Sequence, residues 1–232
     1  MNVPVCLLCG GDGRARRRNV VTQDRAATAK KKPASRRRNR PAPRQRLLDA
    51  ATKLFTEEGI RVIGIDRILR EADVAKASLY SLLGSKDNLV IVYLQKLDDE
   101  YRDRWSERTA AMTDADSKIL AFFDMAIEEE PAKDFRGSPF VNAATEYPRP
   151  ETDSEHNIVA ACVDHRNWMH ATMTELLDKK NGYPSGTQAS QLLIFLDGGM
   201  TGARISREVG PLLTAKDLAR QMLSAPPADY SI

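Results

Sequence analysis

Few side chains in this sequence have the spacing that catalysis requires. Cys162 and His165 would share one face of a helix, and a thiol beside an imidazole can form a nucleophile and its base. Both residues fall in an apolar stripe, a pattern that favours packing over catalysis. The run Glu128, Glu129 and Glu130 is typical of a solvated helix face. We therefore expect no enzyme, and keep a small-molecule hydrolase or thiol enzyme that uses Cys162 and His165 as a rival hypothesis.

Metal binding is not expected either. Cys6 and Cys9 have the C-x-x-C spacing of two zinc ligands, but a structural zinc site needs four. The other candidate ligands, Cys162, His156, His165 and His170, lie far along the chain. Three cysteines also argue against a disulfide framework and for a reducing compartment. The sequence predicts neither a metal nor a cofactor.

Basic side chains gather at the start of the sequence. Residues 1–46 carry a net charge of +12, residues 47–97 are neutral and residues 98–232 carry −9, which leaves +3 overall. We predict that residues 1–42 form a disordered basic arm, because so few apolar residues cannot offset the chain entropy. Such a polycation binds a phosphate backbone without regard to sequence. The alternatives are a solvated tail or an over-extended start of the reading frame.

Membrane insertion is not indicated. No stretch approaches 18 uninterrupted apolar residues, which is the length that a spanning helix needs. The first residues lack the basic and apolar regions of a signal peptide. These observations predict a cytoplasmic protein with no membrane partner.

Helical periodicity begins near Pro43. Apolar residues at helical spacing predict a first helix that ends at Gly59. A short second helix is expected from about Ile65 to Ala72, and a third from about Lys76 to Leu83. Ser85 then caps a long fourth helix in which a large side chain recurs every four positions, at Leu89, Tyr93, Leu97, Tyr101 and Trp105.

Two short helices joined by a tight turn and supported by a preceding helix form a helix-turn-helix DNA-binding unit. The third predicted helix would then be the recognition helix, with Leu79 and Leu83 on its buried side. Small outward side chains let such a helix enter the major groove, while Lys and Tyr reach phosphates or base edges. The predicted DNA-facing residues are Lys76, Ala77, Ser78, Tyr80 and Ser81.

Beyond residue 98 the sequence predicts a bundle of amphipathic helices. Apolar stripes run through residues 119–127, 158–176 and 192–203. A last short helix is expected to begin with a capping box at Thr214-x-x-Asp217 and to end near Ser224. No segment has the alternation of a strand, so the predicted fold class is all-α.

Four motifs follow one another at fixed spacing between residues 44 and 92. They are Leu48-x-Ala50-Ala51-x-x-Leu54-Phe55-x-x-x-Gly59, Ile65-x-x-Ile68, Ala72-x-Val74-x-Lys76-x-Ser78-Leu79-Tyr80 and Ser85-Lys86-x-x-Leu89. In order and spacing they resemble the N-terminal domain of TetR-type transcriptional regulators. The run from Phe135 to Ala144 and the later Leu196-Asp197-Gly198 are similar to C-terminal domains of a subgroup of that family.

The resemblance implies a helix-turn-helix DNA-binding domain at residues 43–92. A long helix joins it to a helical ligand-binding and dimerisation domain at residues 93–225, and residues 226–232 form a tail. The implied partners are a double-stranded DNA operator, a small-molecule effector and a second copy of the chain. Such regulators are most often repressors, and the resemblance places Lys86 on a DNA phosphate.

The sequence also departs from the family pattern. Hydroxyl side chains are usual where Ile63, Gly64 and Ala75 stand, and each lost cap costs about 0.5–2 kcal/mol together with a phosphate contact. We expect phosphate contacts of the arm and of nearby arginines to compensate; these are Arg44, Arg46 and Arg61. A degenerate regulator that binds nucleic acid non-specifically through its arm is the alternative hypothesis.

The resemblance implies an effector cavity inside the bundle. Its predicted lining is aromatic or soft and apolar with one titratable group, and ordinary core packing is the alternative for each member. The predicted residues are Phe122, Met125, Phe140, His165, Trp168, Met169 and Phe195.

A dimer interface on the last two long helices is implied as well. Glycines inside an apolar helix cost about 1 kcal/mol each, so a close partner helix would justify Gly198, Gly199 and Gly202. The predicted interface residues are Leu193, Leu196, Gly199, Met200 and Ala203.

Overall fold

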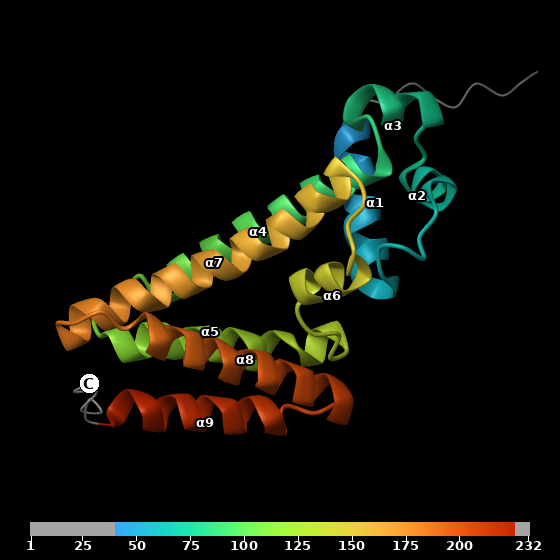
Figure 1. The fold of residues 1–232 in the computed structure, drawn as a ribbon. Helices are drawn as coiled ribbons and strands as arrows, with labels where there is room; N and C mark the ends of the chain where they lie inside the picture. Colours follow the sequence, from blue (N-terminus) through green and yellow to red (C-terminus); the bar gives the residue numbers. More distant parts are fainter. Residues whose placement is uncertain (1–39, 226–232) are drawn as a thin grey trace, which may run out of the picture. The chain divides into compact units, whose positions relative to one another are not determined.

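The structure, a computed structural model, describes residues 40–225. Most of the predicted arm, the tail and the Cys6/Cys9 pair lie outside these residues. The described part is helical throughout and contains no strand (Figure 1), which confirms the all-α fold class. Its elements are α1 (Pro43–Glu58), α2 (Ile65–Ala72), α3 (Lys76–Leu83), α4 (Lys86–Thr109), α5 (Ala115–Glu129), the 3₁₀ helix η2 (Pro131–Lys133), α6 (Pro139–Glu146), α7 (Asp153–Asn181), α8 (Gly186–Ser206) and α9 (Gly210–Ser224). None of the helices between residues 40 and 225 has the length and apolarity to cross a membrane.

The first three helices begin and end, and α4 begins, where the sequence predicts. Gly59 follows α1 with φ at 102°, a conformation that glycine adopts without penalty. Asp73, between α2 and α3, is left-handed with φ at 48°, which aspartate tolerates better than most residues. The Ser85 hydroxyl caps α4 by accepting the Asn88 N–H at 3.0 Å. No side chain caps α2 at Gly64 or α3 at Ala75, as the missing hydroxyls predict.

One hydrophobic cluster holds the helix-turn-helix unit to the helices that follow it. Leu47 of α1, Ile68 of α2 and Leu79 of α3 are fully buried in it. Phe140 of α6 and Ile158 of α7 belong to the same cluster. Packing therefore continues across the domain boundary that the sequence predicts at residue 92.

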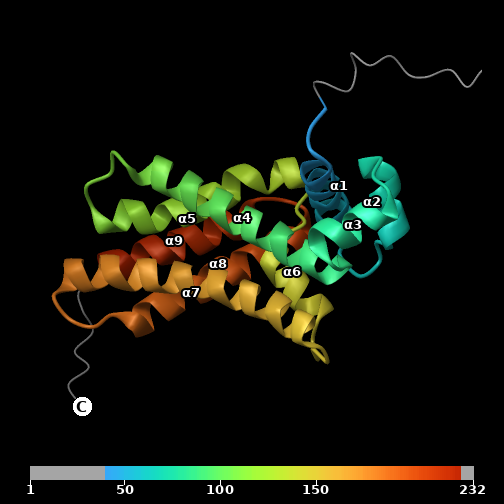
Figure 2. The same cartoon turned by 90° about the horizontal axis from the view of Figure 1, so that it is seen from above.

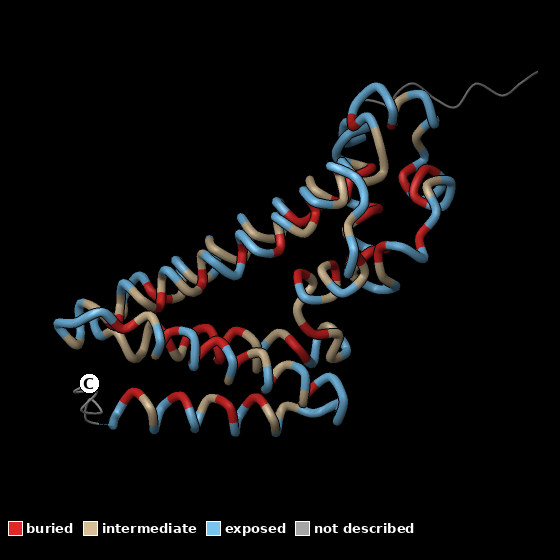
Figure 3. Tube along the Cα trace, in the orientation of Figure 1, coloured by how far each residue is buried: buried red, intermediate tan, exposed pale blue. Residues whose placement is uncertain are grey.

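A second cluster lies between α5, the end of α7, α8 and α9. Figure 2 shows these helices from above, and Figure 3 shows buried positions alternating with exposed ones along α4, α7 and α9. A Cβ atom on Gly199 would lie 2.7 Å from the Ala215 Cβ, and one on Gly202 would lie 2.7 Å from the Pro211 Cβ. These glycines are required by α9 of the same chain.

The predicted dimer interface therefore has to be corrected. Leu193 and Leu196 are 3% exposed and Ala203 is fully buried, while Gly199 is buried under α9. Met200 is half-buried and faces a cavity instead. Four of the five side chains are thus core residues of the monomer, because the predicted stripe is the inner face of α8.

The start of α9 was also predicted wrongly. The helix begins at Gly210, with Pro211 in its first turn, a position where proline's missing N–H costs nothing. The Thr214 hydroxyl donates to the Gly210 carbonyl at 3.1 Å and so lies within the helix instead of capping it. The predicted end at Ser224 is confirmed.

Candidate functional site

The outer face of α3 is exposed and could enter the major groove of DNA. Lys76, Ala77 and Ser81 are exposed, Ser78 is half-buried, and Tyr80 is 49% exposed. The Lys76 ammonium lies 3.6 Å from the Asp66 carboxylate of α2, an exposed contact that a phosphate can replace. All five predicted recognition residues thus share one surface, which agrees with the predicted role and does not test it.

Arg46 has an internal partner that the sequence does not reveal. Its Nη1 donates to the carbonyls of Ala72 at 2.8 Å and Asp73 at 2.7 Å. These carbonyls end α2, where a cation is favoured by the helix dipole. Arg46 therefore ties α1 to the turn of the helix-turn-helix unit, whereas Arg44 is exposed at the start of α1. Phosphate contacts by either arginine stay predictions.

The loop between α1 and α2 is held from two sides at Ile60. The Glu146 carboxylate, at the end of α6, accepts the N–H groups of Ile60 at 3.0 Å and Arg61 at 2.6 Å. The Lys86 ammonium, at the start of α4, donates to the Ile60 carbonyl at 2.7 Å. Burial lowers the pKa of Lys86. We call these contacts the Ile60 clamp.

Arg61 belongs to the same junction. Its Nη1 donates to the Glu146 carbonyl at 3.0 Å, and its guanidinium lies 5.1 Å above the Tyr147 ring. The structure therefore uses two predicted phosphate contacts internally: Arg61 joins the α1–α2 loop to α6, and Lys86 joins the same loop to α4. The two carbonyls that accept these side chains are remote in sequence, so no local pattern could have shown this.

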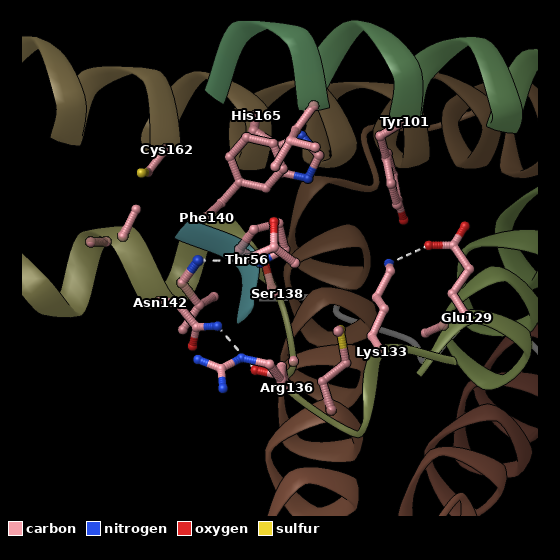
Figure 4. Close-up of a pocket in the computed structure, with 18 of the residues that line it drawn as sticks. Thr56, Tyr101, Glu129, Lys133, Arg136, Ser138, Phe140, Asn142, Cys162 and His165 are labelled. Atoms are coloured by element: carbon pink, nitrogen blue, oxygen red, sulfur yellow. Dashed lines mark hydrogen bonds and ion pairs between the residues drawn. The ribbon is translucent and has the colours of Figure 1, made fainter. Parts of the chain in front are cut away.

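A cavity of about 720 Å³ lies between α1, α4, α6, α7 and α8, a volume typical of small-molecule sites. Its apolar lining includes Phe55, Tyr93, Leu97, Phe140 and Met169. Figure 4 shows Phe140 and Tyr101 lining it, with Arg136 and Ser138 on the segment that leads into α6 and Asn142 within α6.

The predicted cavity residues divide into two groups. Phe140, His165 and Met169 line the cavity as predicted. Phe122 and Met125 are instead buried in the packing of α5, at 0% and 4% exposure. Trp168 stacks edge-on against Tyr101 and Trp105, and Phe195 packs against the second cluster; neither lines the cavity. The prediction placed these four wrongly because helical spacing does not reveal which side of an apolar stripe borders a void.

The sequence did not predict that α4 contributes to the cavity. Tyr93, Leu97 and Tyr101 all line the cavity, and their four-residue spacing was visible in the sequence. That stripe was interpreted only as helix packing. A large side chain every four positions along a helix shared by two domains was the signal that could have found them.

His165 is held in one orientation at the cavity wall. Its Nδ1 lies 2.7 Å from the Asp98 carboxylate, and its ring stacks on Phe140 with centroids 3.7 Å apart. Burial lowers the pKa of His165, and the Asp98 hydrogen bond only partly opposes this. The imidazole is therefore neutral near pH 7, with Nδ1–H donating to Asp98 and Nε2 left as an acceptor.

Cys162 lacks the features of a nucleophile. Its side chain is 6% exposed, and burial raises the pKa of the thiol to about 11. The thiolate, which is the reactive form, is then scarce near pH 7, and the His165 proton is already engaged with Asp98. Among residues 40–225 no cluster of three or more His, Cys, Asp or Glu side chains could hold a metal.

Comparison with known proteins identifies the family. The sequence model described as "Bacterial regulatory proteins, tetR family" matches residues 47–92. The crystal structure of SCO4454, a TetR-family transcriptional regulator from Streptomyces coelicolor, is 31% identical, with a TM-score of 0.66 over 78% of this chain and 92% of that one.

Two curated relatives are also similar. The HTH-type transcriptional regulator LmrA of Bacillus subtilis (strain 168) is 25% identical over 173 residues, which cover 73% of this chain and 90% of LmrA. The HTH-type transcriptional regulator HbdR of Aromatoleum sp. (strain CIB) is 33% identical over 70 residues, which cover 30% of this chain and 31% of HbdR. The motifs, the fold and these relatives agree, and the chain belongs to the TetR family of DNA-binding transcriptional regulators.

Proposed function

We propose that the chain is a cytoplasmic, homodimeric repressor that a small, largely apolar effector releases from a near-palindromic operator. The observation that carries this proposal is the Ile60 clamp. Two elements that line the cavity, α4 and α6, also hold the loop that precedes α2. A ligand that displaces α6 therefore acts directly on the DNA-binding helices.

An effector can shift the equilibrium between the DNA-binding and the DNA-incompetent conformation only if it binds the latter more tightly. Phe140 and Glu146 lie at opposite ends of α6, and both line the cavity. A ligand that pushes against Phe140 would move the Glu146 carboxylate away from the Ile60 and Arg61 amides. This supplies the contact that differs between the two states, as allosteric coupling requires.

The proposed DNA contacts are the exposed residues of α3. Lys76 and Tyr80 reach phosphates or base edges, and the small Ala77, Ser78 and Ser81 allow close approach to the groove. Two such helices, one from each subunit, would bind half-sites about one turn of the duplex apart.

The surface of α8 that faces outward supports self-association. Ile194 and Ile205 are 62% and 79% exposed, and with Gly198 and Thr201 they form a stripe at helical spacing. A Cβ atom on Gly198 would meet nothing within 4 Å in its own chain, so only a partner makes its small size useful. We propose this outer stripe as the centre of the dimer interface, because its apolar side chains are exposed in the monomer. It takes the place of the buried stripe that the sequence suggested.

Sedimentation velocity tests the interface. Ile194→Glu should convert the dimer into a monomer, because it buries an unpaired charge at the contact. Tyr183→Glu, at another exposed apolar side chain, is the matched control and should remain dimeric. A monomeric wild-type chain, or a dimeric Ile194→Glu variant, would refute the assignment.

DNA binding is tested by fluorescence anisotropy with the DNA that flanks the chain's own gene. Lys76→Ala and Tyr80→Ala should each weaken binding, by about tenfold if one good contact is lost. Lys179→Ala, an exposed lysine on α7, should bind as wild type does. Equal affinity in all four proteins would contradict the assignment of α3 as the DNA-recognition helix.

A second candidate function has two observations in its favour. The caps at Gly64 and Ala75 are missing, and Arg46, Arg61 and Lys86 have internal partners. Both facts reduce specific phosphate contact and favour a degenerate regulator that coats DNA through its arm. Competition with random DNA at two salt concentrations separates the candidates, because a purely electrostatic binder shows no preference for the operator at either.

A further inference from the structure

Among residues 40–225, every arginine and lysine side chain that lines the cavity has an ion pair except Arg136. Arg104 Nε and Lys133 Nζ both contact Glu129, at 3.1 Å and 2.5 Å, and Arg166 contacts Asp197 at 2.5 Å. The carboxylates in the lining each accept an ion pair or a backbone amide. Arg136, which precedes α6, has no carboxylate within 4.0 Å among residues 40–225.

The Arg136 side chain is also short of hydrogen-bond acceptors. Its Nε is buried and has no partner in the described structure, a state that costs free energy unless a ligand relieves it. Burial raises the pKa of the Tyr93 hydroxyl, and the Arg136 charge is among the groups that lower it. Since Tyr93 and Arg136 both line the cavity, that charge acts on the cavity itself.

A buried carboxylate, Glu130, lies beside Arg136 and accepts the Gly137 N–H at 2.9 Å, but it makes no ion pair with Arg136 among residues 40–225. Figure 4 shows Arg136 beside Asn142, whose Nδ2 donates to the Arg136 carbonyl at 3.0 Å. The Oδ1 of Asn142 accepts Arg204 Nη1 at 2.5 Å, so a second guanidinium lies nearby with a neutral partner. Ser138, two residues after Arg136, caps α6, and the start of a helix also favours an anion. A second polar atom of the lining, Thr52 Oγ1, is buried without a partner as well.

We propose that the effector is an amphipathic organic anion whose carboxylate pairs with Arg136. Its apolar part lies against Leu97, Phe140 and Met169, and a fork of guanidinium donors suits a carboxylate's two oxygens. The cavity of about 720 Å³ accommodates a chain or ring system of moderate size. This inference rests on the proposed role of the cavity as the effector site and adds the charge that the site selects.

Isothermal titration calorimetry on the full-length protein tests which ligand charge the cavity prefers. The three probes share the same alkyl chain length and differ in their head group. Decanoate should bind about ten- to a hundredfold more tightly than 1-decanol, and decylamine should bind most weakly. Arg136→Gln should abolish the preference for decanoate while leaving the affinity for 1-decanol unchanged. Arg136→Lys keeps the charge and should retain part of the preference. Arg166→Gln removes a paired arginine of the same lining and should retain all of it.

The outcomes separate this inference from the proposed function. Equal binding of decanoate and 1-decanol, unaffected by Arg136→Gln, overturns the anion and leaves the cavity as an effector site. Binding of none of the three probes overturns both. The unfolding temperature of Arg136→Gln should be no lower than that of the wild type, so that a lost preference reflects the removed charge and not a lost fold.

Discussion

The carboxylate of Glu146 accepts the backbone N–H of Ile60 at 3.0 Å, although 86 positions separate the two residues in the sequence. Ile60 is 3% exposed, so its amide has no ready access to water. Gly59 makes the approach possible, since even a Cβ atom there would lie 3.1 Å from Glu146 Oε1. The partly buried hydrogen bonds of this carboxylate thus join the wall of the cavity to the DNA-binding helices.

Removal of this carboxylate should cost both stability and coupling. Glu146→Ala leaves the Ile60 amide without an acceptor, and we expect a loss of about 1–3 kcal/mol in the free energy of unfolding. Urea unfolding measures it. Glu175→Ala removes an exposed carboxylate whose ion pair within residues 40–225 is with the neighbouring Lys179 and should cost less than about 0.5 kcal/mol. Equal losses in the two variants would mean that the clamp carries no special stability.

The contact between α8 and α9 predicts opposite effects at adjacent glycines. Gly199→Ala places a Cβ atom 2.7 Å from that of Ala215 and should destabilise the fold by about 1–3 kcal/mol through overpacking. The Cβ atom that Gly198→Ala adds would have no other atom within 4 Å, so this variant should raise helix stability by up to about 1 kcal/mol. Both are compared by urea unfolding in an Ile194→Glu background, so that association does not contribute. Similar stability of the two variants would contradict the packing described for α8.

His165 should make stability depend on pH. Burial lowers the pKa of the folded imidazole, so the unfolded state binds the proton more readily. The free energy of unfolding should therefore fall as the pH drops below the unfolded value of about 6.5 and level off above it. His165→Asn retains a donor toward Asp98 and removes the titration. Unfolding between pH 5.5 and 7.5 should show a smaller slope for this variant, and an unchanged slope would assign the pH dependence elsewhere.

The basic arm should set the salt dependence of DNA binding. Deletion of residues 1–40 removes 12 basic and 2 acidic side chains, and with them counterion release on binding. We expect weaker binding and a flatter plot of log affinity against log salt concentration. Anisotropy at several salt concentrations measures both, with the intact chain for comparison. An unchanged slope would show that the arm takes no part.

The sequence by itself determined the elements of the DNA-binding domain. Helical spacing, Gly59, the tolerance of Asp73 for a left-handed backbone and the Ser85 cap are local signals, because each acts within a few residues of the chain. The exposed face of α3 followed from the same periodicity. These predictions agree with the structure to the residue at the ends of α2 and α3.

Only the tertiary structure decided what the side chains contact. Arg46 and Lys86 looked like phosphate ligands, yet each binds a carbonyl 26 residues away. Gly199 looked like an intersubunit contact and instead accommodates α9. Within the described residues, the lack of a carboxylate beside the Arg136 guanidinium also depends on which side chains the fold brings near. Periodicity determines which face of a helix is apolar, but whether that face meets its own chain, a second copy or a cavity depends on packing between segments distant in sequence.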